Sequence, residues 1–358
     1  MPKVSVVIPV YRVEGYIEEC IDSVLKQTLR DIEVIAVDDG SPDSSGSILD
    51  RYAEEDHRVT VIHKRNEGVS AARNDGLEKC SGDYIYIMDS DDYLEPDALE
   101  KMVACAEENQ ADVVITDHFT FREDGIQRPH HFFSQPFATS DRETIMQLQR
   151  MVLHSGYSPY YTPENTGLGI STPWTKLLKA SLVTDNGLTF DPYVRGIFDD
   201  GLFALHVFEH AKKTAYIRDQ VYHYRILPGS IIHRFHPDRL ATDRRVFEKI
   251  LEFAEKNNKG EAFRKAYEAK VVQFWVRSFA VYFFHRDYPG NSRQNYREFI
   301  STAKSEPYRE AIRAVDPGIL KKIQRYCVRL SRMHLNPVIW LAFRIYRMAS
   351  GDRNMTRL

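Results

Sequence analysis

The stretch YIYIMDSDDYLEPD, residues 84–97, joins an apolar run to a cluster of aspartates. Residues 84–88 are aromatic, β-branched and aliphatic, a composition that is typical of a buried strand. Asp89, Asp91 and Asp92 follow within four positions, and Asp97 comes shortly after. Carboxylates this close raise one another's pKa unless a positive charge lies among them. The stretch therefore predicts a strand whose end gathers negative charge around a cation.

Strands and helices alternate on both sides of this stretch. Helices with one apolar face separate the apolar, β-branched runs, which lie at residues 4–10, 32–37, 59–63, 84–88 and 111–117. This order predicts an α/β fold with a doubly wound, mainly parallel, Rossmann-like sheet. Ligands of such sheets bind beyond the carboxyl ends of the strands, where this sequence places its polar residues.

The rest of the chain is less regular and then helical. Residues 119–172 lack a clear period, which favours a binding loop. A helix is expected at 174–187 and another at 198–211, followed by two short strands near 214–217 and 221–225. Beyond Pro237 the spacing is helical. We therefore expect a sheet-containing domain over residues 1–235, with a binding loop at 119–172, and a helical region over 236–358.

The aspartate cluster has three interpretations. Asp89 and Asp91 could hold Mg²⁺ or Mn²⁺, which would bind the phosphates of a nucleotide. A calcium loop of the EF-hand type would use Asp89, Asp91 and Glu100, but Leu94 stands where that loop needs glycine. Asp92 or Asp97 could simply cap the next helix, because acids favour helix N-termini.

Other short motifs offer weaker alternatives. The sequence has no GxGxxG after its first strand and no GxxxxGK[ST], so the glycines of dinucleotide and P-loop sites are missing. HVFEH, residues 206–210, has the spacing of a zinc protease motif, but two histidines on an amphipathic helix also occur by chance.

Charge is unevenly distributed although the net charge of the 358 residues is only −3. Residues 319–358 contain nine bases and one acid. Four widely spaced cysteines without a CxxC favour reduced thiols, and no apolar run reaches the roughly 20 residues of a membrane span. We expect a soluble, cytoplasmic protein that does not bind nucleic acid.

Several motifs in fixed order resemble one enzyme family. They are VSVVIPVYRVEGYIEECIDSVLKQT, IEVIAVDDGSPDSSGSILDRYA, NEGVSAARNDGLEKCSGDYIYIMDSDDYLEPD and PWTKLLKASLVTDNGLTFDPYVRGIFDDGLF. These stretches resemble family-2 glycosyltransferases, inverting enzymes of the GT-A fold, of the type that builds bacterial cell-surface polysaccharides. The resemblance extends from the N-terminus to about YRILPGSI and does not cover the helical third.

The resemblance implies roles for individual residues. The aspartate pair at 199–200 matches the family's E-D pair, which implies that Asp200 is the catalytic base. Asp199 stands in place of the usual glutamate, and the match implies that it lies beside the acceptor. Alternatively, Asp199 only caps the helix. Trp174 is either a platform for the acceptor sugar or a core residue. The remaining implied contacts are Pro9, Tyr11, Asp39, Asn66, Arg73, Asp89 and Ser90 for the nucleotide, Arg225 and Ser230 for the diphosphate, and Asp91, Asp89 and His223 for Mn²⁺ or Mg²⁺.

The implied reaction transfers one sugar from a nucleotide sugar with inversion. Asp39 matches a carboxylate that binds uracil, so UDP-hexose or UDP-N-acetylhexosamine is the expected donor. The acceptor is expected to be a hydroxyl of a glycan or of a lipid-linked molecule in cell-envelope or capsular polysaccharide synthesis. The basic tail favours a visit to the cytoplasmic face of the membrane; a helix packed on the enzyme or in a homodimer is the alternative. A non-catalytic sugar-nucleotide-binding module is the alternative function.

Overall fold

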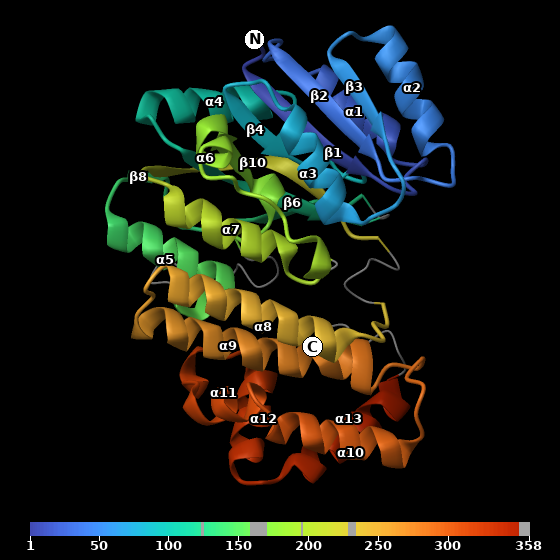
Figure 1. The fold of residues 1–358 in the computed structure, drawn as a ribbon, viewed down its shortest axis with the longest axis vertical. Helices are drawn as coiled ribbons and strands as arrows, with labels where there is room; N and C mark the ends of the chain where they lie inside the picture. Colours follow the sequence, from blue (N-terminus) through green and yellow to red (C-terminus); the bar gives the residue numbers. More distant parts are fainter. Residues whose placement is uncertain (123–124, 158–169, 195, 228–233, 351–358) are drawn as a thin grey trace. The chain divides into compact units, whose positions relative to one another are not determined.

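The structure, a computed structural model, describes residues 1–122, 125–157, 170–194, 196–227 and 234–350. These residues form two compact units: residues 1–152 with 158–227, and residues 153–157 with 228–358. The first unit contains the sheet and the second is helical (Figure 1). The predicted domain boundary after residue 235 stays a prediction.

The first unit is built on one mixed, mainly parallel sheet of ten strands in the order β3-β2-β1-β4-β9-β6-β10-β5, with β7 paired to β6 and β8 to β10. The strands are β1 (Val4–Val10), β2 (Ile32–Asp38), β3 (Val59–His63), β4 (Tyr84–Ile87), β5 (Tyr93–Leu94), β6 (Val113–Phe121), β7 (Arg128–His130), β8 (Phe137–Thr139), β9 (Lys176–Lys179) and β10 (Thr214–Arg225). β1, β2, β3 and β4 are parallel, as are β6 and β10. The predicted doubly wound sheet is confirmed.

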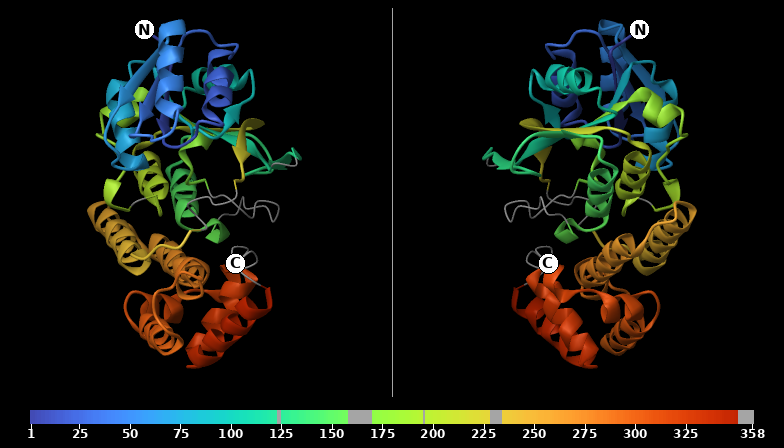
Figure 2. Two further views of the ribbon diagram at one scale, coloured as in Figure 1. Left: turned by 90° about the vertical axis from the view of Figure 1, so that its right-hand side faces the viewer. Right: turned by 90° about the vertical axis from the view of Figure 1, so that its left-hand side faces the viewer.

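Helices cover both faces of this sheet (Figures 1 and 2). They are α1 (Ile17–Leu25), α2 (Ser45–Glu55), α3 (Val69–Lys79), α4 (Ala98–Asn109), α5 (Arg142–Leu153), α6 (Ala180–Thr184) and α7 (Asp199–His210). One face buries α1, α2 and α4 against the side chains of Val6 and Ile8. The opposite face packs α3 closely, because a Cβ at Gly76 would lie 2.4 Å from a methyl group of Val7. This close contact fixes the position of α3 over the sheet.

Two regions differ from the prediction. Residues 176–179, expected in a helix, form β9, which pairs antiparallel with both β4 and β6. Successive side chains of a strand point to opposite faces of its sheet, and Leu177 and Leu178 are each buried on one face. Burial of both residues within the sheet favours the strand over the helix that the spacing of apolar residues predicted. Residues 119–172, expected to be irregular, include α5, whose Ile145 and Leu148 are fully buried. The strands expected near 214–217 and 221–225 form one continuous strand, β10, with a bulge between them.

The second unit consists mainly of helices: α8 (Arg239–Lys256), α9 (Glu261–Ser278), α10 (Ser292–Lys304), α11 (Tyr308–Ala314), α12 (Lys322–Arg332) and α13 (Asn336–Ser350). A π-helical turn at Phe279–Phe283 continues α9. Aromatic side chains fill its core, with the ring of Phe279 in contact with those of Phe299 and Phe343. None of the helices in the described part of the chain has the length and apolar character that crossing a bilayer requires.

Candidate active site

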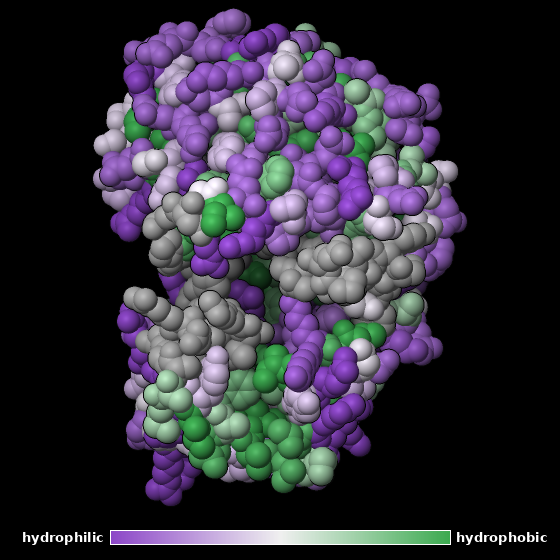
Figure 3. All heavy atoms as spheres, turned by 180° about the vertical axis from the view of Figure 1, so that it is seen from behind, coloured by the Kyte–Doolittle hydropathy of each residue, from purple (hydrophilic) through white to green (hydrophobic). Residues whose placement is uncertain are grey.

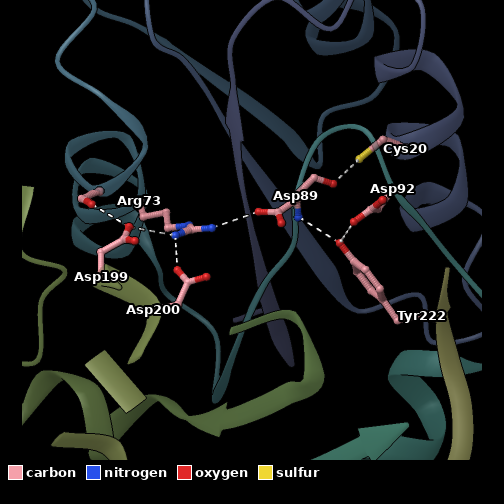
Figure 4. Close-up of polar contacts among 8 residues, drawn as sticks. Cys20, Arg73, Asp89, Asp92, Asp199, Asp200 and Tyr222 are labelled. Atoms are coloured by element: carbon pink, nitrogen blue, oxygen red, sulfur yellow. Dashed lines mark hydrogen bonds and ion pairs between the residues drawn. The ribbon is translucent and has the colours of Figure 1, made fainter. Parts of the chain in front are cut away.

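Acidic and basic side chains from three segments meet at the carboxyl end of the sheet (Figure 4). Asp89 follows β4, Arg73 projects from α3, and Asp199 and Asp200 open α7. Parallel strands end at the same edge, and α3 is held there by its contact with β1, so the fold itself gathers these residues. Of the predicted aspartate cluster, Asp89 thus has a positive side chain of the protein, that of Arg73, as a partner.

Arg73 is the centre of the cluster. Its guanidinium lies 2.9 Å from a carboxylate oxygen of Asp89, 3.3 Å from Asp199 and 2.5 Å from Asp200. The side chain is 4% exposed, and it also lies over the ring of Phe190, 5.1 Å from the ring centroid. A guanidinium spreads its charge over a planar fork of donors, which suits it to several carboxylates at once. Arg73 therefore connects the acidic motif after β4 with the acidic pair of α7.

The two aspartates of α7 are held differently. Asp199 is 3% exposed and also accepts a hydrogen bond from Ser70, at 2.7 Å. Asp200 keeps 30% of its side chain exposed. Burial raises the pKa of Asp200 to about 7 against the opposing effect of Arg73, with Asp199 and Asp89 raising it further. A carboxylate with a pKa near neutrality is suited to accept a proton from an alcohol.

The start of α7 depends on a tight contact beside Asp200. A Cβ at Gly201 would lie 2.1 Å from the ring of Phe198, so only glycine leaves room for that ring. Phe198 stands at the N-cap position and makes no side-chain cap. Asp199 and Asp200 thus lie in the first turn, where the helix dipole favours negative charge. The expected alternative, Asp199 as the N-cap, is wrong.

Asp91 follows Asp89 by two residues in the loop after β4. In the described part of the chain its carboxylate has no hydrogen bond or ion pair to another side chain, while its backbone oxygen accepts from Arg225 at 2.8 Å. Burial and the neighbouring charge of Asp89 raise the pKa of Asp91 to about 6. A cation beside Asp91 would remove this penalty.

These carboxylates fit a hard divalent cation only together with a substrate. The described residues contain no group of three or more histidine, cysteine, aspartate or glutamate side chains that could hold a metal. Asp89 and Asp91 offer two oxygen ligands, and magnesium-type cations commonly take the rest from water and phosphates. The calcium-loop interpretation is not favoured, because Glu100 instead accepts a hydrogen bond from Thr28 at 2.7 Å.

Asp92 has a structural role that the sequence did not indicate. It is 1% exposed and accepts hydrogen bonds from the Tyr222 hydroxyl at 2.6 Å and from the Arg225 amide at 2.7 Å. The same hydroxyl lies 3.1 Å from the amide nitrogen of Asp89. Asp97 stands at the N-cap position of α4, as one interpretation predicted, but its side chain makes no cap hydrogen bond. Asp92 therefore ties the loop after β4 to the end of β10 and holds Asp89 and Asp91 in place.

Arg225 is anchored beside this loop. Its guanidinium donates to the backbone oxygen of Asp91, forms an ion pair with Glu19 and lies over the ring of Phe121 at 4.6 Å. With 17% of its side chain exposed, it borders the aspartate loop, and its contact with a diphosphate stays a prediction. Ser230, the other predicted diphosphate contact, lies outside the described residues.

The predicted nucleotide contacts lie around the end of β1. Pro9 is buried in β1, and Tyr11, just after it, is 42% exposed. Asp39 accepts hydrogen bonds from the amides of Glu67 and Gly68, at 2.9 and 2.8 Å. It thereby fixes the loop that carries the exposed Asn66. Ser90 is buried within the aspartate cluster, at 7% exposure.

Two predicted contacts have other roles in the structure. His223 lies 2.7 Å from Glu95 and stacks on Tyr93. Trp174 is 1% exposed and stacks on Tyr222 with ring centroids 4.4 Å apart. Its ring faces are covered by the protein, so Trp174 is a core residue here and not an open platform for a sugar.

Lys176 was not predicted. It is 2% exposed, and its ammonium donates to the backbone oxygen of Thr172 at 2.6 Å. Burial lowers the pKa of Lys176 to about 7, and the charge of Asp200 opposes this shift. Its place in PWTK, at the first residue of β9, was the only signal in the sequence.

One surface pocket lies away from these residues. It has a volume of about 480 Å³ and is lined by side chains that include Lys101, Phe137 and Tyr216. Tyr216 is near the start of β10, whereas Tyr222 and Arg225 are at its end. The pocket is therefore separate from the carboxylate cluster.

Comparison with known proteins identifies the family. Residues 5–163 match the family described as Glycosyl transferase family 2. The chain is 31% identical over 274 residues to the putative glycosyltransferase EpsH of Bacillus subtilis. The aligned region covers 76% of this chain and 74% of EpsH. It is also 34% identical over 229 residues to the glycosyltransferase GlyA of Streptococcus pneumoniae. That alignment covers 64% of this chain but only 31% of the longer GlyA chain.

Solved structures give the same fold. The crystal structure of Staphylococcus aureus TarS residues 1–349 in complex with UDP-GlcNAc superposes with a TM-score of 0.63 and 21% identity. The match covers 97% of this chain and 92% of that one. The fold is therefore of the GT-A type, with a helical C-terminal region. The chain belongs to glycosyl transferase family 2.

Proposed function

We propose that this chain is an inverting glycosyltransferase in which Asp200 is the general base. One observation carries the proposal: a single guanidinium, that of Arg73, contacts both Asp89 of the D-x-D motif and Asp200. The donor-binding motif and the base are therefore neighbours in one site, although they are far apart in the sequence. An alcohol held beside Asp200 would be within reach of a sugar whose phosphates lie at the aspartate loop.

The donor we propose is a UDP-sugar, a UDP-hexose or UDP-N-acetylhexosamine. Asp39 accepts two amide hydrogen bonds. Because a carboxylate has about four lone-pair sites, Asp39 can accept a further hydrogen bond from the imide N–H of a uracil ring. Tyr11 and Asn66, the neighbouring predicted contacts, are exposed. The TarS crystal structure contains UDP-GlcNAc in complex with that protein, which supports this choice.

The mechanism follows from what each side chain can do. Asp200 accepts the proton of the acceptor hydroxyl, which attacks the anomeric carbon from the face opposite the leaving group. One displacement inverts the configuration, so only one carboxylate base is needed. Arg73 holds Asp199 and Asp200 in their rotamers, and Arg225 lies where it could contact the departing diphosphate. Mn²⁺ or Mg²⁺ at Asp89 and Asp91 would supply positive charge to the diphosphate.

The acceptor we propose is a hydroxyl of a glycan or lipid-linked molecule in bacterial envelope or capsular polysaccharide synthesis. EpsH and GlyA, which are also glycosyltransferases by name, support the transferase class but name no acceptor. We place catalysis in residues 1–235 and propose that residues 236–358 locate the enzyme, on the cytoplasmic side, at a membrane surface.

A screen of UDP-, GDP- and dTDP-sugars tests this proposal. Initial rates of nucleotide release and thermal stabilisation would be measured for each donor, with Mn²⁺, with Mg²⁺ and with chelator. We expect a UDP-sugar to be used fastest and only in the presence of a divalent cation. Stabilisation by a donor without turnover, with a range of glycan acceptors, would instead indicate a non-catalytic binding module.

A further inference from the structure

The outer face of α13 is apolar and exposed. Val338, Leu341, Ile345 and Met348 recur at helical spacing on that face, and they are 47%, 53%, 52% and 72% exposed. Figure 3 shows hydrophobic side chains gathered in one continuous area at the lower end of the view, where α13 lies in Figure 1. Continuous apolar surface of this kind commonly marks a site of interaction.

The inner face of α13 is packed independently of this surface. Ile339 and Phe343 are 1% and 6% exposed, and the indole N–H of Trp340 donates to Asn295 at 2.8 Å. These contacts hold the helix in its unit. The outer side chains therefore lie outside the packed core of the unit. The side of a surface helix that faces away from the core is normally polar, so these exposed apolar residues are unusual.

α12 contacts α13, and its own exposed surface is mixed. The helix buries Cys327 and Val328, whereas Tyr326 and Met333 are 51% and 65% exposed. The exposed Lys322 and Arg329 recur at helical spacing with those two residues. The exposed surface of α12 thus carries apolar side chains with bases beside them.

The charge of this region indicates what it contacts. Residues 319–358 hold nine of the 48 bases and one of the 51 acids, which leaves 39 bases and 50 acids in the rest of the chain. A second copy meeting this face in a two-fold dimer would bring like charges together. The complementary partner of this basic and apolar region is a surface that has negative charge outside and an apolar interior beneath it.

We propose that the outer faces of α12 and α13 bind the surface of a membrane that contains anionic lipid. Apolar side chains of α13 enter the boundary between headgroups and acyl chains, and the bases of α12 lie at the phosphates. The segment lies on the membrane and does not cross it. The proposal is independent of the chemistry at Asp200, because binding to vesicles can be measured without any transfer reaction.

The test is flotation of the full chain with vesicles of phosphatidylglycerol and phosphatidylcholine, compared with vesicles of phosphatidylcholine alone. The apolar variant is Leu341→Gln with Ile345→Gln. Its matched control is Leu251→Gln, an apolar side chain of α8 that is 47% exposed in the same unit. The charge variant is Lys322→Gln with Arg329→Gln, and Lys256→Gln, an exposed base of α8, is its control. Circular dichroism melts confirm that every variant is folded.

We expect the wild type and both controls to float with the anionic vesicles. Partitioning should fall about tenfold or more in the apolar variant, because two aliphatic side chains no longer enter the lipid. The charge variant should bind more weakly and should lose most of the dependence on salt. Unchanged flotation of the apolar variant overturns the proposal. A wild-type dimer in light scattering that becomes monomeric in the apolar variant also overturns it, since the surface is then an interface between copies.

Discussion

Replacing Arg73 with methionine should destabilise the protein in a way that depends on pH. The change keeps an unbranched side chain of similar length but removes the charge that three carboxylates share. Arg73 is 4% exposed and lies within 3.3 Å of Asp89, Asp199 and Asp200. Because Asp199 has the same low exposure, water cannot replace the guanidinium around it.

The cost follows from this geometry. Removing one partner of a buried ion pair commonly costs about 3–5 kcal/mol of unfolding free energy, because the other charge stays buried. An exposed pair contributes about 1 kcal/mol or less. Arg51→Met is the matched control, since Arg51 pairs with Glu18 at the surface with side chains 50% and 56% exposed. Urea unfolding should show a much larger loss for Arg73→Met than for Arg51→Met.

The pH dependence has a definite sign. Arg73 is the largest influence that keeps the pKa of Asp200 from rising further above its ordinary value. Without it, the pKa of Asp200 rises above the value of about 7 that it has beside Arg73, so the folded variant keeps a proton that the folded wild type releases near pH 7. The unfolded chains have already released that proton near pH 3.8, so the stability of the variant continues to fall as pH rises above 7, where the contribution in the wild type levels off. The difference between Arg73→Met and wild type should therefore be larger at pH 7.5 than at pH 5. A loss that matches the Arg51 control, or that is the same at both pH values, would refute the reasoning.

Four further predictions concern the site, the core and the second unit. The kcat/KM for transfer should increase about tenfold per pH unit below pH 7 and level off above it, because Asp200 with a pKa of about 7 must be deprotonated to act as base; a rate that is flat from pH 5.5 to 8 would contradict this. Asp91→Asn should abolish the thermal stabilisation that a donor and Mn²⁺ give together, with the melting temperature of the free protein unchanged or slightly raised, since a raised carboxylate pKa marks an unfavourable charge. Trp174→Ala should cost about 3–5 kcal/mol in urea unfolding, as expected for a fully buried aromatic ring, and an undiminished stability with a higher KM for the acceptor would instead favour the sugar platform. Burial lowers the pKa of Lys270 to about 7, so the unfolded chain binds more protons between that value and 10.5 and stability should increase with pH across that window; Lys270→Met should remove this contribution, which urea unfolding at pH 7 and pH 9 would measure.

The sequence was sufficient to predict which strand ends and which helix start form the site. The apolar strands end at Asp38, His63 and Ile87, and parallel strands must bring those ends to one edge, so the position of Asp89 and Asp91 followed from local pattern. The same reasoning placed α7 with its acidic pair at the start of a helix.

Contacts between distant segments could not be predicted in this way. β9 becomes a strand because β4 and β6 bind its two edges, a long-range effect that outweighs local spacing. Arg73 was expected at the nucleotide, and nothing in its own helix indicated that it joins three carboxylates of two other segments. The sequence left Trp174 open between a sugar platform and a core residue, and its stacking on Tyr222 comes from pairing within the completed sheet. His223, expected at the metal, likewise has its partner Glu95 through that pairing.

The central claim is that Asp200 takes the proton of the acceptor at a site that Arg73 connects to the donor. Asp200→Asn keeps the shape of the side chain and removes its basicity. Calorimetry with the UDP-sugar and Mn²⁺, together with initial rates of transfer, measures donor affinity and turnover on the same variant. The account predicts that turnover falls by about 10²–10⁴-fold while donor affinity stays close to that of the wild type. Turnover that survives, or affinity that disappears together with it, would contradict the assignment of Asp200 as the base.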